Sequence, residues 1–160
     1  MLTLVLCAAL LAPASAWDSL HFLEGEWIGE GSGHPGQGTG GFSLRRELDG
    51  KILVRRNRAE YPATQGRPAF VHEDLMVIYP DAKRAVYFDS EGHVIHYAIE
   101  ADGKSAVFVS EPEAGAPSYR LTYRTTSADT ISILFEMSPP GKDFQKYIEA
   151  KARRSAAATR

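Results

Sequence analysis

The five histidines are the first candidates for chemistry in this chain of 160 residues. His72 opens the string HEDLM, which lacks the second histidine of the zinc motif H-E-x-x-H. His93 and His96 are three residues apart on an expected strand, so they lie on opposite faces and cannot chelate one metal ion together. The pattern predicts structural hydrogen bonding, or polar contacts to a ligand for His72 and His93, and no metal site.

No pattern of nucleophile and base typical of an enzyme is present in the sequence. A G-x-S-x-G elbow is missing, and Glu73 and Asp74 are adjacent, so a strand would place them on opposite faces. Residues 31–36 match G-x-G-x-x-G, but Pro35 lies within the match and QGTGG follows it, where a nucleotide-binding motif needs a helix. The sequence favours a protein that is not an enzyme, with a small hydrolase or isomerase as the weakest alternative.

Arg55 and Arg56 are neighbours on an expected strand, so one of them faces inward. A buried arginine must be paired, because an uncompensated interior charge costs several kcal/mol, on the order of magnitude. Two interpretations follow. In one, the inward arginine forms an internal salt bridge with Glu47, Glu60, Glu73 or Asp74. In the other, Arg56 grips a ligand carboxylate or phosphate in bidentate fashion.

The elements that would position these residues are short strands. Turn signals recur every eight to twelve residues between stretches rich in Val, Ile, Tyr, Phe and Thr, which is typical of an all-β meander. One face of several strands is apolar and the other polar. Closing such a sheet removes its exposed edges, so we expect a single up-and-down antiparallel β-barrel. Its ten strands are expected at residues 25–33, 42–48, 51–59, 70–79, 84–88, 93–100, 104–110, 118–125, 130–137 and 144–153, the last of which also contains helix-forming residues.

Local signals refine this expectation. Residues 18–25 predict a short helical turn, capped by Asp18 or Ser19 and ended by Gly25. Asp49-Gly50 and Asp102-Gly103 favour type I′ turns. In the first strand Gly25, Trp27 and Gly29 share one face, where glycine permits coiling and close approach of another backbone. The glycines of 36–41 predict a flexible loop.

The first sixteen residues resemble a secretory signal. An apolar run over residues 2–12 is followed by Pro13 and by Ala14-Ser15-Ala16, a small-x-small cleavage site. At about eleven residues the run is too short for a membrane span, which needs ~20. We expect a signal peptide at 1–16, a barrel domain at 17–154 and a disordered tail at 155–160, and hence a secreted or periplasmic protein cleaved near Ala16. The net charge of −2 argues against nucleic acid as a partner.

A short helical turn, then Gly25-x-Trp27 on the first strand, then a meander of hairpins resembles the calycin superfamily of lipocalins and fatty-acid-binding proteins. The segments FLEGEWIGEGSG, LDGKILVRR and VYFDSEGHV are most similar to nitrobindin-like and bacterial lipocalin-like proteins of unknown function. The resemblance implies a ligand-binding barrel. Nitrobindin-like proteins hold haem iron through a histidine near the C-terminus, whereas the last histidine here is His96, so haem is not expected.

Together these observations predict a protein that holds a small, mostly apolar, lipid-like molecule inside a barrel, with an acidic head as one option. Trp27 would close the floor, and Arg56 and His72 would orient the polar head. The residues expected to line the wall are Met76, Tyr87, His93, Tyr97, Tyr123 and Phe135. Two alternatives remain: a haem-binding barrel, and a filled barrel that acts in the cell envelope through its surface. The sequence does not determine the oligomeric state.

Overall fold

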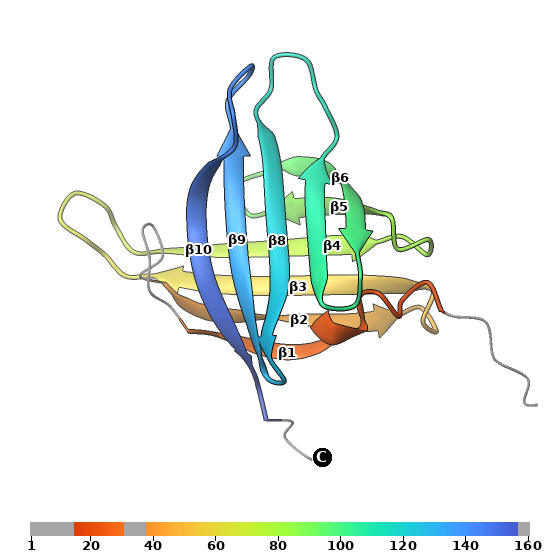
Figure 1. Ribbon diagram of the computed structural model, residues 1–160. Coiled ribbons are helices and arrows are strands. Elements are labelled where there is room, and N and C mark those ends of the chain that lie inside the picture. Colours follow the sequence, from red (N-terminus) through yellow and green to blue (C-terminus); the bar gives the residue numbers. More distant parts are fainter. Residues whose placement is uncertain (1–14, 31–37, 157–160) are drawn as a thin grey trace, which may run out of the picture.

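A computed structural model, described for residues 15–30 and 38–156, shows a closed barrel of ten antiparallel strands preceded by one short 3₁₀ helix (Figure 1). The expected all-β barrel is confirmed, and each expected strand forms, including the closing strand. The elements are η1 (His21–Leu23), β1 (Gly25–Glu30), β2 (Thr39–Glu47), β3 (Ile52–Tyr61), β4 (Phe70–Ile78), β5 (Arg84–Asp89), β6 (Val94–Ala101), β7 (Ser105–Ser110), β8 (Ser118–Ser127), β9 (Thr130–Ser138) and β10 (Gln145–Arg154).

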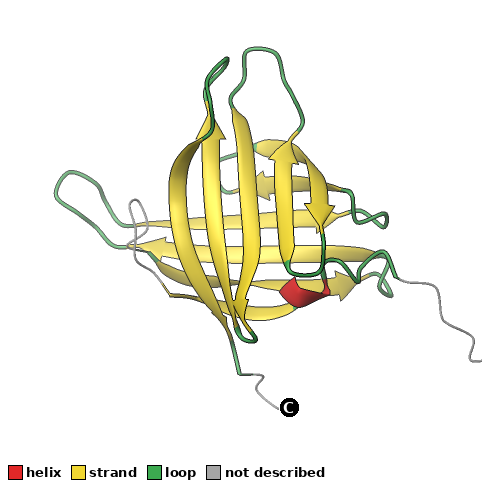
Figure 2. Cartoon of the chain, viewed as in Figure 1, coloured by secondary structure: helices red, strands yellow, loops and turns green. Residues whose placement is uncertain are grey.

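Every strand pairs with its neighbours in the chain, and β1 pairs with β10 to close the barrel. Strands account for nearly all of the regular structure (Figure 2). Because side chains alternate across each strand, one set fills the interior and the other faces solvent. On β3 the inward set contains Leu53, Arg55 and Asn57, while Arg56 and Arg58 are exposed. An arginine is therefore buried, as expected, and it is Arg55.

One end of the barrel, here called the base, is closed by the segment around η1. The Trp17 indole N–H donates to the Gly50 carbonyl at 3.1 Å, and the Trp27 indole N–H donates to the Leu23 carbonyl at 2.8 Å. The guanidinium of Arg154 lies 4.4 Å from the centre of a Trp27 ring. It also donates to the carbonyl oxygens of Glu24 and Phe22, at 2.6 and 3.0 Å. These contacts tie η1 to β1 and β10.

The opposite end, here called the mouth, carries the connections that follow β3, β5, β7 and β9. The buried apolar core lies between the base and the middle of the barrel. Its largest fully buried side chains are Tyr123, Phe108, Leu20, Leu23, Leu53, Met76, Ile78 and Ile131.

Three local expectations are wrong. The N-cap of η1 is Leu20, without a side-chain hydrogen bond, because the carboxylate of Asp18 instead accepts the backbone N–H of Ser15. Asp49 and Gly50 both have positive φ, as a type I′ turn requires, but in the second hairpin only Gly103 does. There the carboxylate of Asp102 accepts two backbone N–H groups, and this fixes the turn.

The third error concerns the glycines at 40 and 41, which lie within β2 rather than in a flexible loop. A Cβ atom on Gly41 would sit 2.2 Å from the Trp27 carbonyl oxygen, and one on Gly40 would sit 2.1 Å from the Arg58 carbonyl oxygen. These two residues allow the backbones of β1, β2 and β3 to approach closely. Gly31 and Gly33 of the expected first strand lie outside the described residues.

Most of the expected signal peptide also lies outside the described residues, which begin at Ser15. Within the described ranges, none of the helical structure is long and apolar enough to cross a membrane.

Candidate functional site

The inner surface of the barrel changes from base to mouth. On β9 the inward side chain nearest the base, Ile131, is 1% exposed. The inward side chains that follow it toward the mouth, Ile133, Phe135 and Met137, are all partly exposed. Solvent therefore reaches apolar side chains on the inside of the barrel wall, and covering them would be favourable.

Aromatic pairs line two walls of the mouth. Tyr61 on β3 stacks on Phe70 of β4, with ring centres 4.5 Å apart and planes 5° from parallel. Tyr119 on β8 stacks on Phe135 of β9, with ring centres 5.9 Å apart and planes 6° from parallel. In the ring of ten strands, β8 is five places from β3 and β9 is five places from β4, so the two pairs lie on opposite walls. In Figure 1, β8 and β9 cross in front of β3 and β4.

A polar network occupies the wall formed by β3 and β4 at mid-barrel. Asp74 lies directly opposite Asn57 in the β3–β4 register and forms a close ion pair with Arg55. The Asn57 amide donates to the Asp74 carboxylate at 2.8 Å, and His72 Nε2 lies 3.3 Å from it. Burial alone would raise the pKa of Asp74, but the charge of Arg55 and these hydrogen bonds outweigh burial and hold the pKa below its usual value.

The network continues through His72 to the turn between β5 and β6. His72 Nδ1 lies 2.9 Å from a carboxylate oxygen of Glu91, and the Tyr87 hydroxyl is 3.4 Å from His72 Nε2. Tyr87 also donates to Asp89 at 3.3 Å, and His93 Nδ1 lies 2.9 Å from the same carboxylate. Hydrogen bonding to Asp74 raises the pKa of His72 above its ordinary value, more than its partial burial lowers it.

Two buried polar atoms in this layer have no hydrogen-bond partner within the described part of the chain: Nε of Arg55 and the hydroxyl of Tyr123. The two groups are neighbours without a well-aligned hydrogen bond. Burial raises the pKa of the Tyr123 hydroxyl, and the charge of Arg55 offsets only part of this effect. An unpaired buried polar atom costs about 1–3 kcal/mol. The wall formed by β3 and β4 therefore carries a polar layer at mid-barrel, between the apolar base and the partly exposed mouth.

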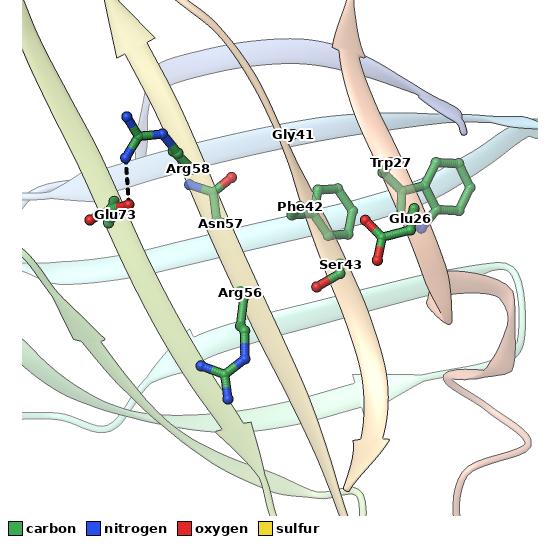
Figure 3. A pocket seen from close by; sticks show the side chains of 9 residues that line it. All are labelled: Glu26, Trp27, Gly41, Phe42, Ser43, Arg56, Asn57, Arg58 and Glu73. Atoms are coloured by element: carbon green, nitrogen blue, oxygen red, sulfur yellow. Dashed lines mark hydrogen bonds and ion pairs between the residues drawn. The ribbon is translucent and has the colours of Figure 1, made fainter. Parts of the chain in front are cut away.

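A hollow of about 300 Å³ lies on the outer face of β1 to β4 (Figure 3). Gly41 forms part of its lining because it has no side chain, and the charged groups at its rim are already paired. Arg58 binds Glu73 at 2.6 Å and also Glu60, and Glu26 binds Arg45. All of these side chains are about half exposed. A groove whose charges neutralise one another presents no unsatisfied group to a ligand, so the mouth is the better candidate.

The sequence-predicted site residues divide into three groups. His72, Tyr87 and Phe135 face inward at or near the mouth, and the first two are in contact. The others that face inward are deeply buried below it: Trp27 at the base, and Met76, Tyr97 and Tyr123.

The remaining two predicted residues point away from the interior. Arg56 lies on the outer face, half exposed and 3.3 Å from Glu47. His93 lies in the exposed turn before β6 rather than on a strand.

Sequence reasoning did not select Asn57, Asp89 or Glu91, and it named Asp74 only as a possible salt-bridge partner. Asp89 and Glu91 belong to the string DSEG, which was interpreted as a turn signal alone. Asp89, Glu91 and the following His93 alternate along this turn, and that spacing could have identified them. Their approach to His72, nineteen residues from Glu91, depends on the pairing of β4 with β5.

Comparison with known proteins does not assign a function to this site. No model of a protein family matches the chain, and no curated protein matches it. The closed ten-strand antiparallel barrel is compatible with a calycin-like fold, and the functional argument depends on the residues of the mouth.

Proposed function

We propose that the protein binds a small, mostly apolar molecule non-covalently in the mouth half of its barrel. The observation that carries this proposal is the change in burial along β9, from Ile131 at 1% exposure to the partly exposed Ile133, Phe135 and Met137. Apolar side chains that face the inside of a barrel and remain in contact with water gain about 25 cal/mol per Å² when an apolar ligand covers them.

The walls of the mouth favour a ligand with a flat or ring-shaped apolar part. Two stacked aromatic pairs face each other across the barrel, and aromatic faces contribute additional affinity for other π-systems. The polar end of the ligand would lie beside the Tyr87 hydroxyl, which donates to Asp89 and can still accept a hydrogen bond. Both ring nitrogens of His72 already lie against carboxylates, so His72 would reach the ligand only by giving up one of these contacts. An acidic head is not supported, because Asp74 already neutralises Arg55, and Asp89 and Glu91 would repel a carboxylate.

Haem is not proposed. Among the described histidines His72 is the one that faces inward, and each of its ring nitrogens lies against a carboxylate, Glu91 on one side and Asp74 on the other. An axial ligand to iron needs a free ring nitrogen, so His72 would first have to lose one of these contacts.

Two further parts of the proposal depend on the sequence. We propose membership of the calycin superfamily, supported by the resemblance of the first strand and by the closed meander that the structure shows. We also propose export to the periplasm or the extracellular space, supported by the apolar run and the small-x-small site before Trp17. N-terminal sequencing of the protein recovered from an exporting host tests the second point, since cleavage predicts Trp17 as the first residue.

Titration with N-phenyl-1-naphthylamine, a neutral aromatic dye whose fluorescence rises in apolar surroundings, tests binding directly. Saturable enhancement is expected, and Phe135→Ala should weaken it about tenfold, the equivalent of ~1.4 kcal/mol. Phe88→Ala is the matched control, because Phe88 is an aromatic residue that faces outward on β5 and is 41% exposed. The absence of saturable binding, or an equal loss in both variants, would favour the filled barrel instead.

A further inference from the structure

Three potential metal ligands gather in the turn between β5 and β6, at the mouth of the barrel. The carboxylates of Asp89 and Glu91 and the imidazole of His93 each offer one ligand atom, and these atoms all lie within 4.8 Å of one another. The ligand atoms of a tetrahedral site lie about 3–3.5 Å apart, given bond lengths near 2.1 Å. Glu91 and His93 are exposed side chains of a turn, so small rotations about their χ angles can close the difference.

We propose that Asp89, Glu91 and His93 bind a divalent transition-metal ion of the zinc type. Two carboxylate oxygens and one imidazole nitrogen form a mixed donor set, and imidazole favours Zn²⁺ and its neighbours over Mg²⁺ or Ca²⁺. Three protein ligands leave a fourth position for water or for a polar group of another molecule. The proposal does not depend on ligand binding in the barrel, because all three residues belong to one turn.

Groups behind the cluster hold two of the three ligands in place. The hydroxyl of Tyr87 donates to the Asp89 carboxylate at 3.3 Å, and His72 Nδ1 lies 2.9 Å from Glu91. His72 is in turn fixed from its other side by the buried carboxylate of Asp74, which Arg55 holds. Outer partners of this kind orient metal ligands, and their loss typically weakens binding 10–100-fold. The other carboxylate oxygen of Asp89 accepts the backbone N–H groups of Glu91 and His93, at 3.1 and 2.9 Å, and this fixes the turn that carries the three ligands.

The charge at the turn also favours a bound cation. Asp89 and Glu91 contribute two carboxylates, and their ion-pair partners within the described residues are the histidines His93 and His72 rather than a lysine or an arginine. Arg55 is already paired with Asp74. One divalent ion would balance the two carboxylates.

Isothermal titration of the full-length protein with Zn²⁺ alone, with Co²⁺ as a spectroscopic substitute, tests the site. Every protein in the comparison carries Cys7→Ser, because a thiolate would bind zinc by itself. One ion per chain is expected, and His93→Ala and Glu91→Gln should each weaken binding at least about tenfold. Because both residues lie in an exposed turn, these variants should keep the circular dichroism spectrum of the parent.

His96→Ala is the matched control, since His96 is an exposed, outward-facing histidine on β6, three residues from His93. It should bind with unchanged affinity. The proposal is overturned if no saturable binding is seen, if His93→Ala and Glu91→Gln bind as tightly as the parent, or if His96→Ala loses as much affinity as they do.

Discussion

The base and the mouth of this barrel are built from the same ten strands, yet they are stabilised in different ways. At the base, Trp27 is 3% exposed and is enclosed by η1 on one side and by Arg154 on the other. At the mouth, Phe135 is stacked on Tyr119 but remains partly exposed on the inside of the wall. Both aromatic side chains face the barrel interior because side chains alternate along their strands. They differ in how completely neighbouring groups cover them.

This difference separates stability from function along the barrel axis. The base buries apolar side chains completely and satisfies the carbonyl groups of η1 through Arg154, so it contributes most to the free energy of folding. The mouth leaves apolar surface partly uncovered and gathers carboxylates and histidines on one wall. A region of that composition contributes less to folding and leaves surface that a ligand can cover.

The largest expected effect is that of Trp27→Ala. The substitution removes a buried indole together with its hydrogen bond to Leu23 and the ring on which Arg154 lies. Truncation of a buried tryptophan costs about 3–5 kcal/mol. Chemical denaturation followed by circular dichroism should show this as a lower midpoint.

The matched substitution at the mouth, Phe135→Ala, should cost only about 1–2 kcal/mol, because the side chain is partly exposed and full burial of such a residue contributes about 1.5–3. It should instead weaken binding of the apolar dye. Equal losses of stability in the two variants would show that the mouth is as well packed as the base, and would remove the basis of the proposed function.

The second largest effect tests the polar layer between the two halves. Asp74→Asn removes the charge that pairs with Arg55, whose side chain is 11% exposed, and should cost about 3 kcal/mol at neutral pH, the lower end for a broken buried pair. The pKa of Asp74 is held below its unfolded value of about 3.9, so its stabilising effect is complete above that pH and is lost as the pH falls through the folded pKa.

Denaturation midpoints measured from pH 7 down to pH 2 should therefore approach one another for the parent and Asp74→Asn once the pH falls below about 4. Glu73→Gln is the control, because Glu73 is the adjacent carboxylate on the outer face, and its exposed pair with Arg58 contributes at most ~1 kcal/mol. A gap between the parent and Asp74→Asn that stays constant over this pH range would contradict the assigned role of the charge.

The sequence was sufficient to predict the barrel because its strands alternate and its turns are strongly marked. On β2 the apolar side chains of Phe42 and Leu44 alternate with the polar Ser43 and Arg45, and this pattern indicates which face of the strand is buried. Closure of the sheet into a barrel is then expected because it removes the exposed edge strands. Each of these inferences uses only neighbours along the chain.

The site was harder to predict because β3 does not alternate between apolar and polar residues near Arg55 and Arg56. Arg55 and Arg56 are identical in type, so only the pairing with β4 determines which one is inside. The glycines at 40 and 41 resembled a loop, since the atoms that exclude a side chain there belong to β1 and β3. The contact between Glu91 and His72 likewise depends on the pairing of β4 with β5.

The smallest expected effect concerns Arg56, the residue that the sequence favoured as a ligand contact. Its side chain is 59% exposed and its partner Glu47 is 40% exposed, so Arg56→Ala should change the free energy of unfolding by no more than ~1 kcal/mol. Dye binding should be unchanged, because the outer face does not reach the mouth. Arg55→Ala differs by one position in the sequence and should lower the denaturation midpoint clearly, since it leaves Asp74 as a buried charge without its partner. If Arg56→Ala weakened dye binding while Arg55→Ala did not, the inward face of β3 would be the opposite of the one described, and the assignment of both wall and mouth would fail with it.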